Sequence, residues 1–173
     1  VSTSRVIVLD TSLSMARDTV FEDARRTAEQ LIAARPPGTR VGLLAAADTL
    51  TVIAPLTADD ALLNASLRRW VPGAGSLAFD GLMVQIDAVV SSMAEADEAV
   101  EVHLISDFQA SAMPARFNGL LADVSWPVVL QRVGEDEPNW AIESLRFQDD
   151  GVDALTVDVR GFATHDALVD VVL

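Results

Sequence analysis

The sequence predicts an α/β fold in which helices cover both faces of a mostly parallel sheet. Three observations support this prediction. Runs of aliphatic and β-branched residues, typical of buried strands, occur at 6–9, 40–46, 100–106 and 127–133. Segments with helical spacing of apolar residues lie between most of these runs. Hydrophobic residues make up 50% of the 173-residue chain, which is enough to bury a sizeable core.

A first helix is expected between the runs at 6–9 and 40–46. Thr19 and Glu22 have the spacing of a capping box, which marks a helix start. Apolar residues then recur at helical spacing, at Phe21, Ala24, Ala28, Leu31 and Ile32. The sequence Pro36-Pro37-Gly38 ends this helix.

The middle of the chain predicts a hairpin and two further helices. The turn Asp48-Thr49 separates the strand at 40–46 from a short strand at 50–54, which pairs back on it. The residues Thr57-Ala58-Asp59-Asp60 predict the start of a helix that runs to about Trp70. After a loop at 71–75, one face of a longer helix carries Leu82, Ile86, Val89, Val90 and Met93.

The pattern changes after residue 133, which predicts two parts in the chain. Before that point, Pro114 suits the first turn of a short helix holding Phe117, Leu120 and Leu121. Beyond it, an acidic connector at 134–138 leads to strand-like segments at 141–147, 154–159 and 167–173, with a turn at Asp149-Asp150-Gly151. We therefore expect a domain at 1–133, and at 134–173 a connector with the start of an incomplete β-sandwich-like module.

Composition excludes several functions. The formal net charge of −14 argues against a nucleic-acid partner, because phosphate binding requires a basic surface. The absence of cysteine excludes disulfides and thiolate metal sites. No run approaches the ~20 apolar residues of a membrane span, and no signal peptide is visible. Because the chain begins with Val1 and a strand follows almost at once, we expect an excised fragment, with any membrane attachment through segments outside it.

Oxygen-bearing side chains follow the first strand. The residues Asp10-Thr11-Ser12-Leu13-Ser14 place a carboxylate and two hydroxyls on alternate positions, so in an extended loop they point the same way. A second carboxylate, Asp107, follows the strand at 100–106. If the two strands are parallel neighbours, both carboxylates face one crevice at the carboxyl edge of the sheet, where ligands bind in open α/β sheets. Such oxygen donors suit hard cations such as Mg²⁺.

These residues resemble the metal-ion-dependent adhesion site of von Willebrand factor A (VWA) domains. The resemblance covers roughly residues 4–133. It implies a Rossmann-like three-layer fold with a mostly parallel sheet and an antiparallel edge strand. It also implies a metal set of Asp10, Ser12, Ser14, Ser76 and Asp107. Ser76, in the segment Gly73-Ala74-Gly75-Ser76, stands where the family has a threonine. The segment at 104–109 further resembles bacterial membrane-anchored VWA proteins of the aerotolerance (Bat-like) type, which implies a parent in the cell envelope.

The resemblance implies a non-enzymatic module that binds another protein through Mg²⁺, Mn²⁺ or Ca²⁺. Two carboxylates balance the charge of a divalent ion, and neutral hydroxyls leave it able to accept another anionic oxygen. A partner's Asp or Glu side chain would provide that oxygen. Met15 and Phe108 flank the motif and could form an exposed contact rim around it.

Other interpretations stay open at this point. Asp10 could be the nucleophile of a phosphatase or hydrolase. Haloacid-dehalogenase-type phosphatases, however, have a second aspartate where this chain has Ser12, and receiver domains need a lysine, which this chain lacks. The metal site could also be degenerate, with Ser76 only capping the following helix. Asp107 and Asp48 could be solvated loop residues, and His103 reads as a residue of a strand face.

Overall fold

The computed structural model of the chain describes residues 3–17, 19–77, 79–95, 97–108, 126–134, 139–149 and 153–162. The chain divides into two compact units, Val1–Gly134 and Glu135–Leu173. The elements in chain order are β1 (Thr3–Asp10), η1 (Leu13–Ala16), α1 (Val20–Ala33), β2 (Arg40–Ala46), β3 (Leu50–Thr57), α2 (Asp60–Arg69), α3 (Phe79–Met93), β4 (Ala99–Ser106), β5 (Val128–Arg132), β6 (Asn139–Asp149) and β7 (Asp153–Phe162).

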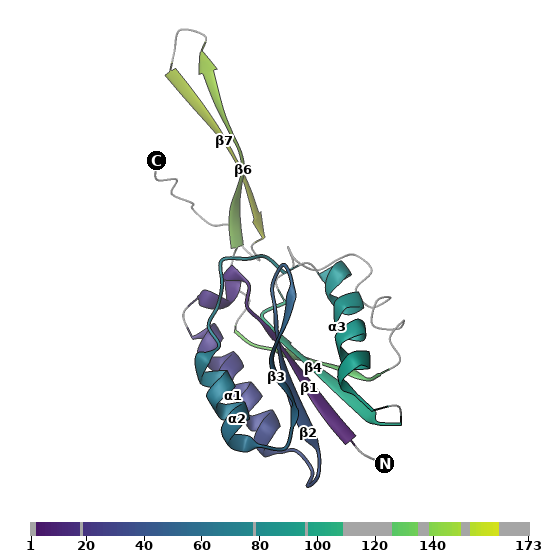
Figure 1. Cartoon of the computed structure of the whole chain (residues 1–173). Helices are drawn as coiled ribbons and strands as arrows, with labels where there is room; N and C mark the ends of the chain where they lie inside the picture. Colours follow the sequence, from purple (N-terminus) through teal and green to yellow (C-terminus); the bar gives the residue numbers. More distant parts are fainter. Residues whose placement is uncertain are drawn as a thin grey trace. The chain divides into compact units, whose positions relative to one another are not determined.

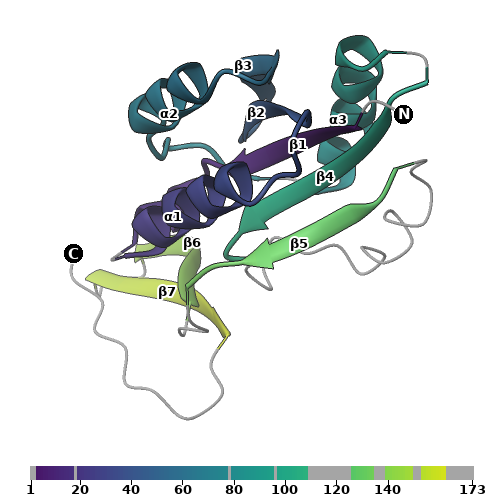
Figure 2. The ribbon, with the colours of Figure 1, turned by 90° about the horizontal axis from the view of Figure 1, so that it is seen from below.

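The first unit contains a sheet with the strand order β3-β2-β1-β4-β5 (Figure 2). β1 is central and pairs in parallel with both β2 and β4, and β4 pairs in parallel with β5. β3 is the antiparallel edge strand. Helices α1 and α2 lie on one face of the sheet and α3 on the other (Figure 1). The predicted three-layer, Rossmann-like architecture is therefore confirmed.

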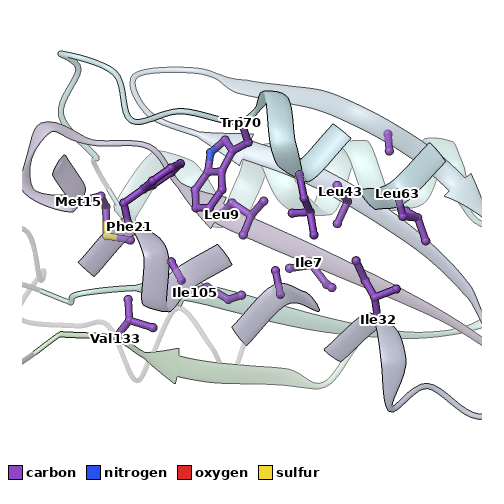
Figure 3. Packing of buried hydrophobic residues seen from close by; sticks show 14 of the residues in the cluster. Ile7, Leu9, Met15, Phe21, Ile32, Leu43, Leu63, Trp70, Ile105 and Val133 are labelled. Atoms are coloured by element: carbon purple, nitrogen blue, oxygen red, sulfur yellow. The ribbon is translucent and has the colours of Figure 1, made fainter. Parts of the chain in front are cut away.

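The core consists of two layers, one on each face of the sheet. Ile7 and Leu9 of β1 point toward α1 and α2, in the cluster that contains Phe21 and Trp70 (Figure 3). Val6 and Val8 point the other way, into the cluster around α3. These four residues of β1 are fully buried, because helices cover both faces of this central strand. A strand buried on both sides reads as a continuous apolar run rather than an alternating one.

The edge strand β3 is longer than the sequence predicts, since it ends at Thr57 rather than near Ala54. Pro55 lies within it, and proline has no amide hydrogen for a sheet ladder. Among the described strands, β3 pairs only with β2, and this pairing shifts register around Val41, Leu43 and Leu44. Edge strands and such irregularities are the places where a sheet accepts proline.

Helices α1 and α2 begin close to where the sequence predicts, but the hydrogen bonds at their N-termini differ from those expected. α1 begins after Thr19, but the predicted capping box does not form there. The backbone of Thr19 is already helical, and its hydroxyl donates to Asp23 Oδ2 at 3.2 Å instead of accepting from a backbone amide. α2 is capped by Asp59, whose Oδ1 accepts hydrogen bonds from the amides of Ala61 and Leu62 at 2.9 and 3.1 Å.

The second unit contains the antiparallel pair β6 and β7, with one register shift between Ile142 and Ser144. These strands correspond to the strand-like segments expected at 141–147 and 154–159. The segment at 167–173 and the short helix expected near Pro114 lie outside the described residues. That the second unit opens a β-sandwich-like module therefore stays a prediction. Within the described part of the chain, none of the helices has the length and apolar character needed to cross a membrane.

Candidate metal centre

Asp10 and Asp107 lie at the ends of two neighbouring parallel strands. Asp10 is the last residue of β1, and Asp107 directly follows β4. Both residues are buried, with exposed fractions of 2% and 6%. They line one pocket of about 250 Å³, together with Ser12, Leu13, Ser14, Gly75, Ser76, Leu77, Phe79 and Ser106. The crevice expected at the carboxyl edge of the sheet is therefore present.

Hydrogen bonds hold both carboxylate oxygens of Asp10. Oδ1 accepts from the amide of Ser12 at 2.8 Å, and Oδ2 accepts from the hydroxyl of Ser106 at 2.5 Å. Burial raises the pKa of Asp10, the two serine hydrogen bonds oppose that rise, and the charge of Asp107 adds to it. Asp10 is thus a carboxylate held in one orientation at the base of the pocket.

The hydroxyls of Ser12 and Ser14 connect the first loop to Asp107. Their Oγ atoms are 3.1 Å apart, and Ser14 Oγ donates to Asp107 Oδ1 at 3.2 Å. The 3₁₀ helix η1 begins directly after Ser12 and places Ser14 within it. All five predicted ligands therefore line one pocket, and hydrogen bonds link four of them: Asp10, Ser12, Ser14 and Asp107.

The second oxygen of Asp107 pairs with Arg17, a residue that the sequence analysis did not single out. Arg17 Nη2 lies 3.1 Å from Asp107 Oδ2, and Arg17 Nε donates to the carbonyl of Ser14 at 3.1 Å. The side chain of Asp107 is 5% exposed and that of Arg17 is 29% exposed. Asp107 is consequently a buried, paired carboxylate and not a solvated loop residue.

Ser76 lines the same pocket, but its hydrogen bonds are made with Asp48. Its amide and its hydroxyl both donate to Asp48 Oδ1, each at 3.2 Å. Helix α3 begins only at Phe79, so Ser76 is not the residue that caps it. Backbone hydrogen bonds attach this loop to the first one, from Leu13 N to Gly75 O at 3.0 Å and from Gly73 N to Thr11 O at 2.8 Å.

The contact rim differs from the one expected. Met15 is fully buried, because η1 turns it into the core beside Phe21 (Figure 3). Leu13, the first residue of η1, is 62% exposed and borders the pocket. Phe108 is partly buried and its ring stacks on Phe79, with centroids 5.8 Å apart. The exposed apolar residue at the site is therefore Leu13.

Three contributors to the site were missed: Ser106, Arg17 and Asp48. Ser106 immediately precedes Asp107, so its adjacency was the one available signal for it. Arg17 and Asp48 contact residues 90 and 28 positions away, and no local pattern marks either of them.

His103 lies on a strand face, as expected. Its Nε2 is 3.0 Å from Glu101 Oε1, and burial lowers the pKa of its imidazole.

The donor set determines which ions the site could hold. Its side chains offer carboxylate and hydroxyl oxygens, which suit hard cations such as Mg²⁺ rather than soft ones. Across the described ranges, no group of three or more His, Cys, Asp or Glu residues gathers in a way that could hold a metal. A site here would therefore depend on serine hydroxyls as well as on its two carboxylates.

A mostly parallel sheet between two layers of helices, with a pocket at its carboxyl edge, is the architecture of open α/β domains. The von Willebrand factor type A domain family matches residues 5–109, which is more than half of the chain. The chain belongs to this family. A comparison with functionally curated proteins finds no match.

Solved structures with the same fold include two from Bacteroides. An aerotolerance-related membrane protein of Bacteroides fragilis has 19% sequence identity and a TM-score of 0.61, over 90% of this chain and 81% of that one. BatB of Bacteroides thetaiotaomicron has 16% identity and a TM-score of 0.61, over 91% of this chain and 80% of that one. At these identities the likeness shows that the fold is shared.

Two further structures are larger than this chain. The proximal thread matrix protein 1 of mussel byssus, solved with a zinc-occupied MIDAS motif, has 16% identity and a TM-score of 0.57 over 74% of this chain. The vWF domain of the pili tip protein Mfa5 of Porphyromonas gingivalis has 20% identity and a TM-score of 0.51 over 62% of this chain. The chain spans only 35% and 38% of these two proteins.

Proposed function

We propose that this domain binds another protein through a divalent cation held by Ser12, Ser14 and Asp107. Asp10 and Ser76 complete the proposed set. The observation that carries the proposal is the spacing of three oxygens along one wall of an open pocket. Ser12 Oγ and Ser14 Oγ are 3.1 Å apart, and Ser14 Oγ is 3.2 Å from Asp107 Oδ1.

That spacing suits an octahedral ion. Mg²⁺ binds oxygens at 2.0–2.1 Å, so neighbouring ligands at right angles are about 3.0 Å apart. The two separations in the structure, 3.1 and 3.2 Å, are slightly longer than this value, and they connect the three oxygens in sequence. Small side-chain rotations would suffice to turn a hydrogen-bonded row of this kind toward a shared cation.

The remaining residues have supporting roles in the proposal. Asp10 contributes negative charge while the amide of Ser12 and the hydroxyl of Ser106 hold its orientation. The hydroxyl of Ser76 donates its hydrogen to Asp48, which leaves its oxygen lone pairs available to a cation. The bound ion would supply a Lewis-acid position for an oxygen of a partner's Asp or Glu side chain, beside the exposed Leu13.

The comparisons support this proposal at the level of the family. The byssus protein is described with zinc in its MIDAS motif, and the Mfa5 domain belongs to a pilus tip. The likeness to Bat-like proteins of Bacteroides favours a parent protein in the cell envelope. The formal charge of −14 also favours attraction of divalent cations.

The geometry speaks against a hydrolase that uses Asp10 as its nucleophile. The residue is 2% exposed, and both of its oxygens accept hydrogen bonds. Each oxygen keeps a lone pair, but the two donors and the near-complete burial restrict its approach to a substrate. The proposal therefore assigns Asp10 to the metal site and not to catalysis.

The test is calorimetric titration of Mn²⁺ into the chelator-treated chain. We expect the wild type to bind one ion, and the double variant Ser12→Ala/Ser14→Ala to bind at least tenfold more weakly. The matched control is Ser92→Ala, whose hydroxyl donates to the Val89 carbonyl on an exposed part of α3. At an ion concentration of 100 Kd, the melting temperature of the wild type should rise by roughly 5–10 °C.

Two results would count against the proposal. No binding at millimolar Mn²⁺ would indicate a scaffold with a degenerate site, for which the serine at position 76, where the family has a threonine, is the present argument. The partner part is tested with glutarate, a mimic of a glutamate side chain. Glutarate should shift the amide signals of Leu13 and Ser14 when Mg²⁺ is present, and an equal shift without Mg²⁺ would contradict a metal-mediated contact.

A further inference from the structure

Arg17 occupies a position that the proposed function does not explain. It follows η1 directly, and its guanidinium turns back toward the loop it has just left. Nε donates to the carbonyl of Ser14, and Nη2 pairs with Asp107 Oδ2, both at 3.1 Å. The hydroxyl of the same Ser14 donates to the other oxygen of Asp107 at 3.2 Å. Arg17 is thus attached at two points to the residues that border the proposed ion.

We infer that Arg17 is a built-in counter-cation of the site, which holds Asp107 and lowers the affinity for the metal. This inference rests on the proposed function. Among the described residues, Asp10 and Asp107 are the two carboxylates that line the pocket. The guanidinium cancels one of their two negative charges, so an incoming divalent ion meets a site with less net charge than its ligands alone would give.

Burial makes this pairing effective. The side chain of Asp107 is 5% exposed, so water screens its interaction with Arg17 only weakly. Arg17 is 29% exposed, which leaves its guanidinium an outward path to solvent. The ion pair stabilises the metal-free site. When the ion binds, Arg17 must either move away from Asp107 or stay close to the bound cation, and both cost free energy. The pair therefore sets the metal concentration at which the site fills.

The experiment compares Mn²⁺ affinity between arginine variants of the whole chain by calorimetry. Arg17→Gln removes the charge, and we expect its Kd to fall about tenfold, equivalent to about 1.4 kcal/mol. The matched control is Arg26→Gln, which removes the same charge from an exposed pair with Asp23 on α1. Its Kd should stay within twofold of the wild type, because a distant surface charge is screened by salt.

The direction of the change separates this inference from a structural role. If Arg17 only positioned Asp107, its loss would weaken metal binding, so an unchanged or higher Kd in Arg17→Gln overturns the inference and leaves the proposed function standing. Arg17→Lys keeps the charge and should bind like the wild type, and a Kd as low as that of Arg17→Gln would also overturn it. An absence of Mn²⁺ binding in every variant overturns the proposed function itself. Thermal melts of the metal-free variants establish that each one is folded.

Discussion

The hydroxyl of Ser106 donates a hydrogen bond to Oδ2 of Asp10 at 2.5 Å, and so joins the carboxyl ends of two neighbouring parallel strands. The same Ser106 oxygen accepts a hydrogen bond from the amide of Phe108 at 3.0 Å. Phe108 adopts a φ of +45°, which is uncommon for a residue other than glycine. One serine therefore orients Asp10 and also holds the turn that carries Asp107.

Ser106→Ala should destabilise the metal-free protein by about 1–3 kcal/mol, because a buried carboxylate oxygen of Asp10 loses its donor. The measurement is urea unfolding at pH 7. Ser92→Ala provides the comparison, since its hydroxyl is exposed and bonds only locally, and it should change stability by about 0.5 kcal/mol or less. Equal effects of the two substitutions would show that the contact with Asp10 carries no particular weight.

Asp48→Ala should release the loop that carries Ser76. Asp48 Oδ1 accepts hydrogen bonds from both the amide and the hydroxyl of Ser76, and both residues are exposed. We expect the Ser76 amide to exchange its hydrogen at least tenfold faster, while the free energy of unfolding changes by about 0.5 kcal/mol or less. Hydrogen exchange followed by NMR measures the first effect. If the exchange rate at Ser76 stayed the same, Asp48 would not be what holds this loop.

The stability of the domain should depend on pH through Glu98. Burial on its own would raise the pKa of its carboxyl, but hydrogen bonds from Arg40 and Ser4 outweigh burial and lower it from 4.5 to about 2. Arg40 Nη2 lies 2.7 Å from Glu98 Oε2, and the Glu98 side chain is fully buried. Because the pKa is lower in the folded state, the stabilisation is complete above about pH 4.5 and is lost as the pH falls toward 2.

Glu98→Gln tests this dependence. We expect a loss of about 1.5–3 kcal/mol at pH 7, since the hydrogen bonds involve charged groups. The difference from wild type should shrink between pH 4.5 and 2, as followed by thermal melts. Glu95→Gln is the control, because Glu95 contacts the same Arg40 at 3.2 Å with a side chain that is 73% exposed. Its effect at pH 7 should be about 1 kcal/mol or less, as for surface ion pairs. A constant Glu98→Gln difference down to pH 2 would contradict the argument.

Two glycines with positive φ should respond differently to alanine. Gly38 has a φ of +84° and open space around its Cα, so Gly38→Ala should cost about 1–2 kcal/mol from backbone strain alone. Gly134 has a φ of +76°, and an added Cβ would lie 2.9 Å from Val20 Cγ2. Gly134→Ala should therefore cost about 1–3 kcal/mol more than Gly38→Ala, from crowding against a buried side chain. Chemical unfolding of both variants measures the difference, and equal costs would mean that Val20 moves aside freely.

Local sequence predicted the elements and their order well. Apolar runs identified β1, β2 and β4, and helical spacing identified α1 and α3, because burial selects side chains at fixed periods along the chain. It was less reliable where local signals compete with tertiary context. The strand expected at 50–54 continues to Thr57 through Pro55, because β3 lies at an edge and shifts its register there.

The candidate metal site also has a part that the sequence predicted and a part that it did not. The motif Asp10-Thr11-Ser12-Leu13-Ser14 and the aspartate after β4 could be recognised from sequence, because parallel strands bring their carboxyl ends to one edge. The partners of these residues could not be, since Arg17 meets Asp107 and Ser76 turns to Asp48 only once the loops are packed together. Residue type and period thus determined which groups reach the edge of the sheet. Only the tertiary structure decided which of their oxygens are shared with other side chains, because hydrogen bonds between distant loops depend on register and packing that no local pattern encodes.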